Sequence, residues 1–297
     1  MGEARRLTVR AAGGRDLEVL VDGPEGGTVL LFHSGTPSAV VRNPFITNPA
    51  AKRGLRVVSY SRPGYASSTP SPGRSVADAA QDCEAILDAL AADRFVTLGW
   101  SGGGPHALAC AALLAERCMS AATLGGVAPY GAPGLDWFAG MGQDNIDEFG
   151  AAVAGEGPIT EFLEKTAPEL RQVTGPELSA ALGGLASDVD KAALTGEFAD
   201  MLAESFRRGV STGIAGWRDD DLAFARPWGF DLKSIRVPVA IWQGAQDFMV
   251  PFGHGRWLAA NIAGAQSRLL DDEGHISLLN HIDRILEDLV ELGTAAG

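Results

Sequence analysis

Basic residues are scarce in this chain. Its 297 residues include 24 lysines and arginines against 37 aspartates and glutamates, which gives a net charge of −13. A basic surface is needed both for sequence-independent binding of nucleic acid and for docking on anionic membranes. We therefore expect no nucleic-acid partner and no membrane partner, and we attribute the acidic balance to solubility.

Long apolar runs and cysteines are scarce as well. No stretch reaches the roughly 18 apolar residues of a membrane span, and residues 1–10 lack the apolar segment of a signal peptide. The three cysteines, Cys83, Cys110 and Cys118, are widely spaced and lie in apolar helical patterns. An odd, scattered set of this kind predicts buried free thiols in a reducing cytoplasm rather than disulfides or a zinc site.

Signatures of bound cofactors are missing too. No G-x-G-x-x-G follows the first strand pattern, and no G-x-x-x-x-G-K-[ST] occurs anywhere in the chain. No pair of histidines combines metal-ligand spacing with a carboxylate. We therefore expect no nucleotide, no metal and no other cofactor. His106 lies inside an apolar helical pattern, and we interpret it as a packed core residue.

What is present is an alternation of strand and helix patterns. Residues 7–10 and 17–21 alternate apolar and polar side chains, as half-exposed antiparallel strands do. Residues 28–32, 55–60 and 94–98 are more continuously apolar, which is typical of central parallel strands. Helical patterns separate these segments. The alternation predicts an α/β fold with a mostly parallel central sheet flanked by helices.

The alternation stops in the middle of the chain. From about residue 130 to residue 226 helical patterns dominate, and strand patterns return at residues 237–242 and 267–270. The simplest explanation is one α/β core interrupted by a helical insertion. We predict a first core segment at 1–129, a helical cap at 130–226 and a second core segment at 227–297.

The most informative motif is Gly99-Trp100-Ser101-Gly102-Gly103, which fits G-x-S-x-G. It lies between a strand pattern and the helical pattern that begins at Pro105. A serine on such a turn is exposed as a nucleophile in a strained conformation, and small neighbours let strand and helix approach closely. With 38 glycines in the chain the motif alone arises easily by chance, so its position between strand and helix carries the prediction. The alternative is a glycine-rich loop with a solvent-facing serine.

A serine hydroxyl needs a base, and the base needs an orienting carboxylate. His275 follows the last strand pattern, where the carboxyl end of a parallel strand would present it to a crevice. Asp247 follows the strand at 237–242 and is the candidate acid. A loop histidine and a helix-capping aspartate are the alternatives at these two positions. Asp136, after an earlier strand, is a second candidate for the acid.

An oxyanion hole needs two backbone N–H donors. Gly102, directly after the nucleophile, is expected to supply one of them. The other should come from the loop His33-Ser34-Gly35-Thr36-Pro37, where Thr36 is the candidate because Pro37 has no N–H.

Taken together, these segments resemble the α/β-hydrolase fold superfamily, in its serine-nucleophile form with a helical cap. The matching segments, in chain order, are residues 33–37, 61–67, 99–103, 244–251 and 274–275. The resemblance implies a triad of Ser101, Asp247 and His275, and an oxyanion hole of Thr36 and Gly102. A serine nucleophile disfavours the dehalogenases and epoxide hydrolases of this fold, which use aspartate. Arg62, in the second segment, is expected to hold loops at the edge of the crevice.

The resemblance implies a hydrolase without cofactors that acts on a small or medium carboxylic ester or lactone through an acyl-enzyme. We expect an apolar pocket for this small molecule, and the candidate pocket residues are Gly35, Trp100, Trp137, Trp217 and Phe248. The sequence leaves the oligomeric state open.

Three alternatives stay open. A C–C bond hydrolase or a proline-iminopeptidase-like aminopeptidase would use the same triad. The aminopeptidase would need acidic cap residues for the substrate ammonium, and the candidates are Glu161, Glu164, Asp219, Asp220 and Asp221. The third alternative is a receptor or scaffold that retains the fold. An intact triad argues against it, because a binding module needs no general base.

Overall fold

The computed structural model describes residues 4–295, in which eight strands form one sheet. The strand order across the sheet is β1-β2-β4-β3-β5-β6-β7-β8. Strand β2 pairs antiparallel with β1 on one side and with β4 on the other, and all the remaining pairs are parallel. The bounds are β1 Arg5–Arg10, β2 Asp16–Asp22, β3 Thr28–His33, β4 Leu55–Tyr60, β5 Phe95–Trp100, β6 Cys118–Leu124, β7 Val239–Gly244 and β8 Gln266–Leu270. The predicted α/β fold with a mostly parallel sheet is confirmed.

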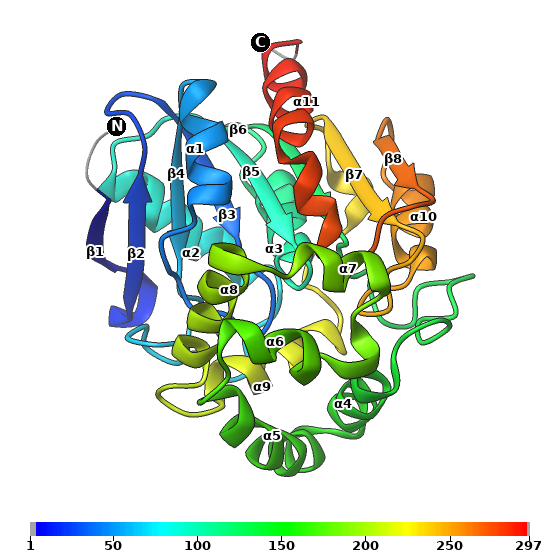
Figure 1. The fold of residues 1–297 in the computed structure, drawn as a ribbon. Coiled ribbons are helices and arrows are strands. Elements are labelled where there is room, and N and C mark those ends of the chain that lie inside the picture. Colours follow the sequence, from blue (N-terminus) through cyan, green and yellow to red (C-terminus); the bar gives the residue numbers. More distant parts are fainter. Residues whose placement is uncertain (1–3, 296–297) are drawn as a thin grey trace.

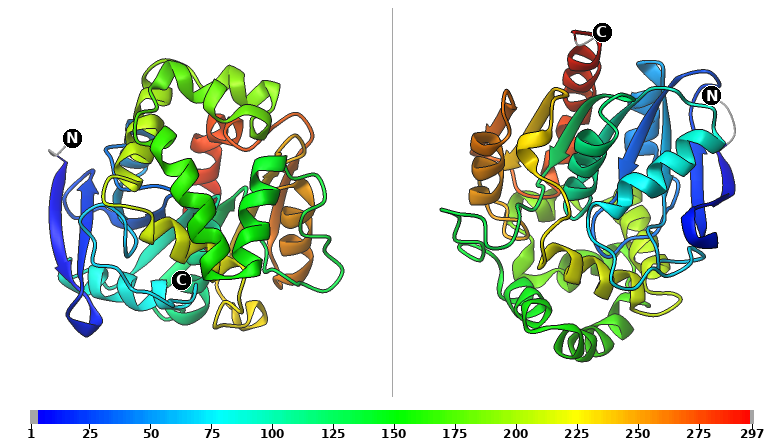
Figure 2. Two further views of the ribbon diagram at one scale, coloured as in Figure 1. Left: turned by 90° about the horizontal axis from the view of Figure 1, so that it is seen from below. Right: turned by 180° about the vertical axis from the view of Figure 1, so that it is seen from behind.

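Helices cover both faces of this sheet, which explains the continuously apolar central strands. In β3, Leu30 packs into the core on one face and Leu31 into the core on the other. One face is covered by α1 (Pro44–Lys52) and α11 (Ile282–Ala295), and Figure 1 shows both in front of the strands. The other face, turned to the viewer in the right panel of Figure 2, is covered by α2 (Asp78–Ala89), α3 (Gly103–Leu113) and α10 (Phe252–Asn261).

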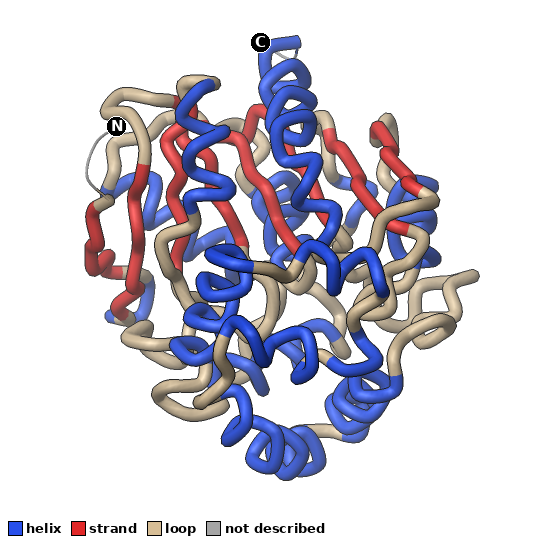
Figure 3. The backbone as a smooth tube through the Cα atoms, in the orientation of Figure 1, coloured by secondary structure: helices blue, strands red, loops and turns tan. Residues whose placement is uncertain are grey.

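Six further helices lie between β6 and β7, where the strand patterns stop. Figures 1 and 3 show them gathered below the carboxyl ends of the parallel strands. We call them the cap helices: α4 Gln143–Ala154, α5 Glu156–Leu170, α6 Gly175–Ala181, α7 Asp188–Ala193, α8 Gly196–Gly209 and α9 Ala215–Phe224. The boundaries 1–129, 130–226 and 227–297 stay a prediction. Across residues 4–295, none of the helices combines the length and apolarity needed to cross a membrane.

Candidate active site

The turn between β5 and α3 holds Ser101 in a left-handed backbone conformation, with φ at +57°. A non-glycine residue is rarely found there, and such strain is concentrated at functional sites. The glycines of the turn are sterically required. A Cβ on Gly99 would overlap the carbonyl of Gly103, and a Cβ on Gly103 would overlap the carbonyl of His33. The main chain is fixed by a 2.8 Å hydrogen bond from the Ser101 N–H to the Leu124 carbonyl.

The loops after β7 and β8 bring His275 and Asp247 together. His275 Nδ1 lies 2.7 Å from Asp247 Oδ2, and both side chains are buried. The other carboxylate oxygen, Oδ1, accepts hydrogen bonds from the N–H groups of Met249 (2.9 Å) and Val250 (2.7 Å). These contacts fix the carboxylate, which in turn fixes the imidazole. Asp136, the other candidate acid, is exposed.

His275 and Ser101 line the same cavity of about 50 Å³, which we call the nucleophile cavity. Because Nδ1 faces Asp247, Nε2 is the ring nitrogen left for the serine hydroxyl. Within residues 4–295 no hydrogen bond joins the two side chains. Such bonds are often long in ligand-free enzymes and shorten when substrate binds.

Opposing effects set the pKa of His275. Burial, the largest single effect, lowers it, but the charge and hydrogen bond of Asp247 and the charge of Asp190 together outweigh burial, so the pKa lies above its ordinary value of 6.5. For Asp247, burial raises the pKa and His275 partly offsets this effect.

Thr36 and Gly102 lie side by side next to the nucleophile. A Cβ on Gly102 would come within 2.6 Å of Thr36 Oγ1, so the two residues are in close contact. Both line a second cavity of about 50 Å³ together with Ser101 and Asp221, which we call the acidic cavity. The Gly102 carbonyl lies 2.8 Å from His106 Nδ1. Burial lowers the pKa of His106 to about 3, so the ring stays neutral.

A buried ion network supports the loop that contains Thr36. Arg62 donates hydrogen bonds to the carbonyls of Ser34 (2.6 Å) and Gly35 (2.9 Å), and to the Asp220 carboxylate at 2.6 Å. Thr36 Oγ1 donates to the same carboxylate at 2.9 Å. The loop is thereby tied to the cap helix α9. Arg62 therefore holds the loop that contains Thr36 from a buried position, the structural role expected for it.

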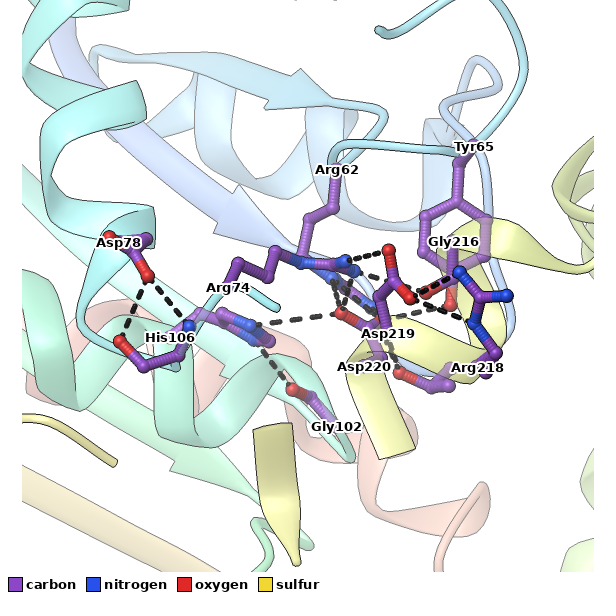
Figure 4. Close-up of polar contacts among 12 residues, drawn as sticks. Arg62, Tyr65, Arg74, Asp78, Gly102, His106, Gly216, Arg218, Asp219 and Asp220 are labelled. Atoms are coloured by element: carbon purple, nitrogen blue, oxygen red, sulfur yellow. Dashed lines mark hydrogen bonds and ion pairs between the residues drawn. The ribbon is translucent and has the colours of Figure 1, made fainter. Parts of the chain in front are cut away.

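Asp220 is the centre of this network, as Figure 4 shows. Its carboxylate also accepts hydrogen bonds from Arg74 (2.7 Å) and Tyr65 (2.8 Å). Burial raises the pKa of Asp220, but Arg62 and Arg74 outweigh burial and hold the pKa below its ordinary value. A carboxylate this heavily engaged has no free acceptor for a substrate ammonium.

Comparisons with known proteins agree with this fold. The model of the alpha/beta hydrolase fold family matches residues 27–282. The chain belongs to this family. A pimeloyl-[acyl-carrier protein] methyl ester esterase of Aromatoleum aromaticum is 27% identical over 259 residues, which cover 82% of this chain and 90% of that one. A 2-hydroxy-6-oxononadienedioate/2-hydroxy-6-oxononatrienedioate hydrolase of Klebsiella pneumoniae is 27% identical over 284 residues, which cover 91% of this chain and 89% of that one.

Solved structures show the same fold. An enol-lactonase from Burkholderia xenovorans superposes with a TM-score of 0.70 at 21% identity, over 97% of this chain and 100% of that one. An alpha/beta hydrolase fold protein from Nakamurella multipartita gives 0.71 at 24% identity, over 99% and 100%. With relatives named esterase and hydrolase, this member of the family is a hydrolase, and the receptor alternative is set aside.

The hydrolase's nucleophile cavity contains two of the predicted pocket residues, Gly35 and Trp100. Trp137, Trp217 and Phe248 line neither this cavity nor the acidic cavity. Trp137 is buried against other aromatic rings and donates its indole N–H to the Ala128 carbonyl at 2.8 Å. The Trp217 indole N–H is donated to Glu148 at 2.6 Å. Phe248 is 42% exposed. Packing turns Trp137 and Trp217 inward and leaves Phe248 in solvent, so the structure places none of the three in either cavity.

Five apolar residues that the sequence did not single out line the nucleophile cavity: Leu182, Leu202, Phe206, Met249 and Ile276. Leu202 and Phe206 are four residues apart on the cap helix α8, so they share one face of it. Helical spacing was the available signal, but it does not tell which face of a helix meets the substrate.

The five acidic cap residues have different surroundings. Glu161 and Glu164 are exposed, and Asp219 pairs with Arg218. Because Asp220 is engaged in the network, Asp221 is the one of the five that remains a candidate for binding a substrate ammonium. It is buried and lines the acidic cavity, and within residues 4–295 no N–H or hydroxyl group donates to its carboxylate, which faces the Glu148 carboxyl.

The cysteines are buried free thiols. Cys83 and Cys110, with His33, place three potential metal-ligating atoms within 4.8 Å of one another. The pKa of the Cys110 thiol is raised by its hydrogen bond with Cys83 and by burial, and burial raises that of Cys118 to about 12. Cys83 and Cys110 both belong to the buried hydrophobic core on one face of the sheet, and we interpret the cluster as core packing.

Proposed function

We propose that this hydrolase cleaves a small or medium carboxylic ester or lactone through Ser101, His275 and Asp247. The observation that carries the proposal is the buried Asp247–His275 pair, 2.7 Å apart, whose histidine lines the same cavity as the strained Ser101. Such a pair serves to hold one tautomer of an imidazole and to stabilise the imidazolium form.

In the proposed reaction Ser101 Oγ attacks the substrate carbonyl carbon while His275 Nε2 takes the hydroxyl proton. The oxyanion that forms accepts hydrogen bonds from the N–H groups of Thr36 and Gly102. The alcohol leaves with the proton from His275, and an acyl-enzyme remains. Water, deprotonated by His275, then releases the acid and restores the serine.

The lining of the nucleophile cavity favours an apolar acyl group. Its cap side chains are Leu182, Leu202 and Phe206, and a cavity of about 50 Å³ suits a short chain. In this proposal residues 130–226 form a cap over Ser101, which limits water and strengthens the oxyanion contacts.

The test is an activity screen with p-nitrophenyl esters of increasing acyl length, lactones and aminoacyl anilides. Wild type should prefer short esters or lactones, and Ser101→Ala should lose this activity while remaining folded. Activity that survives in Ser101→Ala would refute the proposal. Exclusive turnover of 2-hydroxy-6-oxononadienedioate, a compound in the name of the Klebsiella pneumoniae relative, would instead favour the alternative of a C–C bond hydrolase.

A second candidate function is supported by Asp221. Burial raises the pKa of this carboxyl well above its ordinary value, and the neighbouring Glu148 carboxyl raises it further. In this second candidate function we take Asp221 and Glu148 to hold one proton between their carboxyls, which leaves a single negative charge. That charge, in a cavity that also contains Ser101, suits the ammonium of an amino-acid ester or amide.

Alanine methyl ester and methyl isobutyrate distinguish the two candidates, because a methyl group replaces the ammonium in the second compound. An amine-selective enzyme should prefer the alanine ester, and Asp221→Asn should remove that preference. Equal kcat/KM values for the two compounds in wild type would exclude this second function.

A further inference from the structure

The turn that carries His275 is held by a carboxylate of the cap. Asp190 lies in the cap helix α7 and is fully buried. Its Oδ2 accepts a hydrogen bond from the His275 N–H at 3.1 Å. Its Oδ1 accepts from the N–H groups of Ile276 (2.7 Å) and Ser277 (3.0 Å). One side chain therefore accepts hydrogen bonds from three consecutive amides, beginning at the proposed base.

These amides need an acceptor because they open a short helical turn. Ser277–His281 forms the 3-10 helix η4, and the first N–H groups of any helix lack partners inside it. Asp190 supplies the acceptor from 85 residues earlier in the chain. Gly274 makes the approach possible, since a Cβ there would overlap the Asp190 carboxylate. This explains on steric grounds why glycine precedes His275.

The carboxylate is itself fixed in place. Ser187, at the start of α7, donates its hydroxyl hydrogen to Asp190 Oδ2 at 2.8 Å, in a capping box with the Asp190 N–H. Within residues 4–295 Asp190 takes part in no salt bridge, so its charge is stabilised by these hydrogen bonds. Removing it would leave three buried amides without acceptors, and a buried polar group that loses its hydrogen-bond partner is destabilising.

We propose that Asp190 is a positioning residue, which couples the seating of cap helix α7 to the orientation of His275 toward Ser101. The proposal rests on the proposed function. With α7 in place, the turn at 275–277 is fixed and the base faces the nucleophile. If α7 moves away, the turn loses its acceptor and the base loses its orientation. The cap would then shape the pocket and also assemble the catalytic machinery.

The charge of Asp190 gives the proposal a signature in the pH dependence. Two carboxylates act on the His275 imidazole: Asp247 from the loop after β7, and Asp190 from α7. On η4, His281 is paired with Glu273 at 2.7 Å. Burial lowers the pKa of His275, and Asp247 and Asp190 both raise it. Neutralising Asp190 should therefore lower the pKa at which the base becomes active.

Asp190→Asn is the informative variant, with Asp188→Asn as its matched control. Asp188 lies two residues away in the same helix but is exposed. The asparagine keeps one oxygen acceptor and removes the charge. We expect the acid limb of kcat/KM to move to lower pH, and kcat per active site to fall by roughly tenfold with little change in KM. Asp190→Ala, which removes both acceptors, should lower kcat by about a hundredfold, the effect of a misplacement near 1 Å. Asp188→Asn should match wild type.

A purely structural role makes a different prediction. Asp190→Asn would then lower the folded fraction, counted by titration with a serine-reactive phosphonate, and leave the pH profile and the kcat per titrated site unchanged. That result overturns the proposal, as does an equal effect of Asp188→Asn. If Asp190→Ala does not fold, the Asp190→Asn profile decides.

An NMR titration of the His275 imidazole separates this proposal from the proposed function, because it needs no substrate. The titration is carried out in the Ser101→Ala background. The His275 pKa should be lower in the protein that also carries Asp190→Asn than in the protein that retains Asp190. If the pKa falls but no ester or lactone is hydrolysed, the proposed function fails and the coupling stands. If activity is present but the pKa and kcat do not move, the coupling fails alone.

Discussion

Neutralising Asp220 should both destabilise the protein and loosen the loop that contains Thr36. In Asp220→Asn the shape is kept, but two buried guanidinium groups, those of Arg62 and Arg74, lose a shared counterion. Removing one partner of a buried ion pair costs about 3–5 kcal/mol. Arg74 retains Asp219 at 3.4 Å, so Arg62 bears most of the loss. We expect the free energy of unfolding to fall by about 3–5 kcal/mol, and Tm to fall on the order of 10 °C.

Urea unfolding at several pH values is the assay. Because the pKa of Asp220 is held below its ordinary value of 3.8, its contribution to stability is present above that pH and is lost as pH falls through the folded-state pKa. The gap between wild type and Asp220→Asn should therefore narrow below about pH 4. Glu164→Gln, on the exposed surface of α5, is the control and should change nothing. A loss under about 1 kcal/mol, with kcat unchanged, would refute the view that this network holds the Thr36 loop.

Three other predictions concern the site. Asp247→Asn should lower kcat by about 10⁴-fold, because it favours the wrong imidazole tautomer, and Asp136→Asn should leave kcat nearly unchanged. Kinetics with a p-nitrophenyl ester test this, and the reverse ranking would move the acid to the earlier strand. The kcat/KM of wild type should rise with pH through a pKa above 6.5, since His275 must be neutral to act as a base; an acid limb below that value would contradict the assignment. Measured across an ester series, Phe206→Ala should shift selectivity toward longer acyl chains, whereas Trp137→Ala should leave selectivity unchanged and lower Tm. The opposite pattern would mean that Trp137 contacts the substrate.

The core could be predicted from the sequence because its signals are local. Parallel strands covered on both faces need continuous apolar runs, and residues 28–32 and 55–60 have them. Each proposed triad residue follows a strand pattern directly, and the carboxyl ends of parallel strands meet at one edge of the sheet. That rule brings Asp247 and His275 together although 28 positions separate them.

The cap could not be predicted at the same level, because its contacts are set by how helices pack. Helical spacing located the insertion, but it does not tell whether Trp137 or Phe206 faces the substrate. Asp190 and Asp220 illustrate the same limit. Each is one acidic residue among the 37 in the chain, and its role depends on a partner in a distant segment: the turn at 275–277 for Asp190, and Arg62 for Asp220. Only the tertiary structure identifies these partners.

Covalent labelling of the nucleophile tests the central claim most directly. The native protein is treated with a serine-reactive phosphonate, digested, and its peptides are analysed by mass spectrometry, beside Ser101→Ala treated in the same way. We predict one adduct per chain, on the peptide that contains Ser101, and no adduct and no ester hydrolysis in the variant. An adduct on another residue, or a Ser101→Ala protein that keeps wild-type activity, would contradict the assignment of Ser101 as the nucleophile.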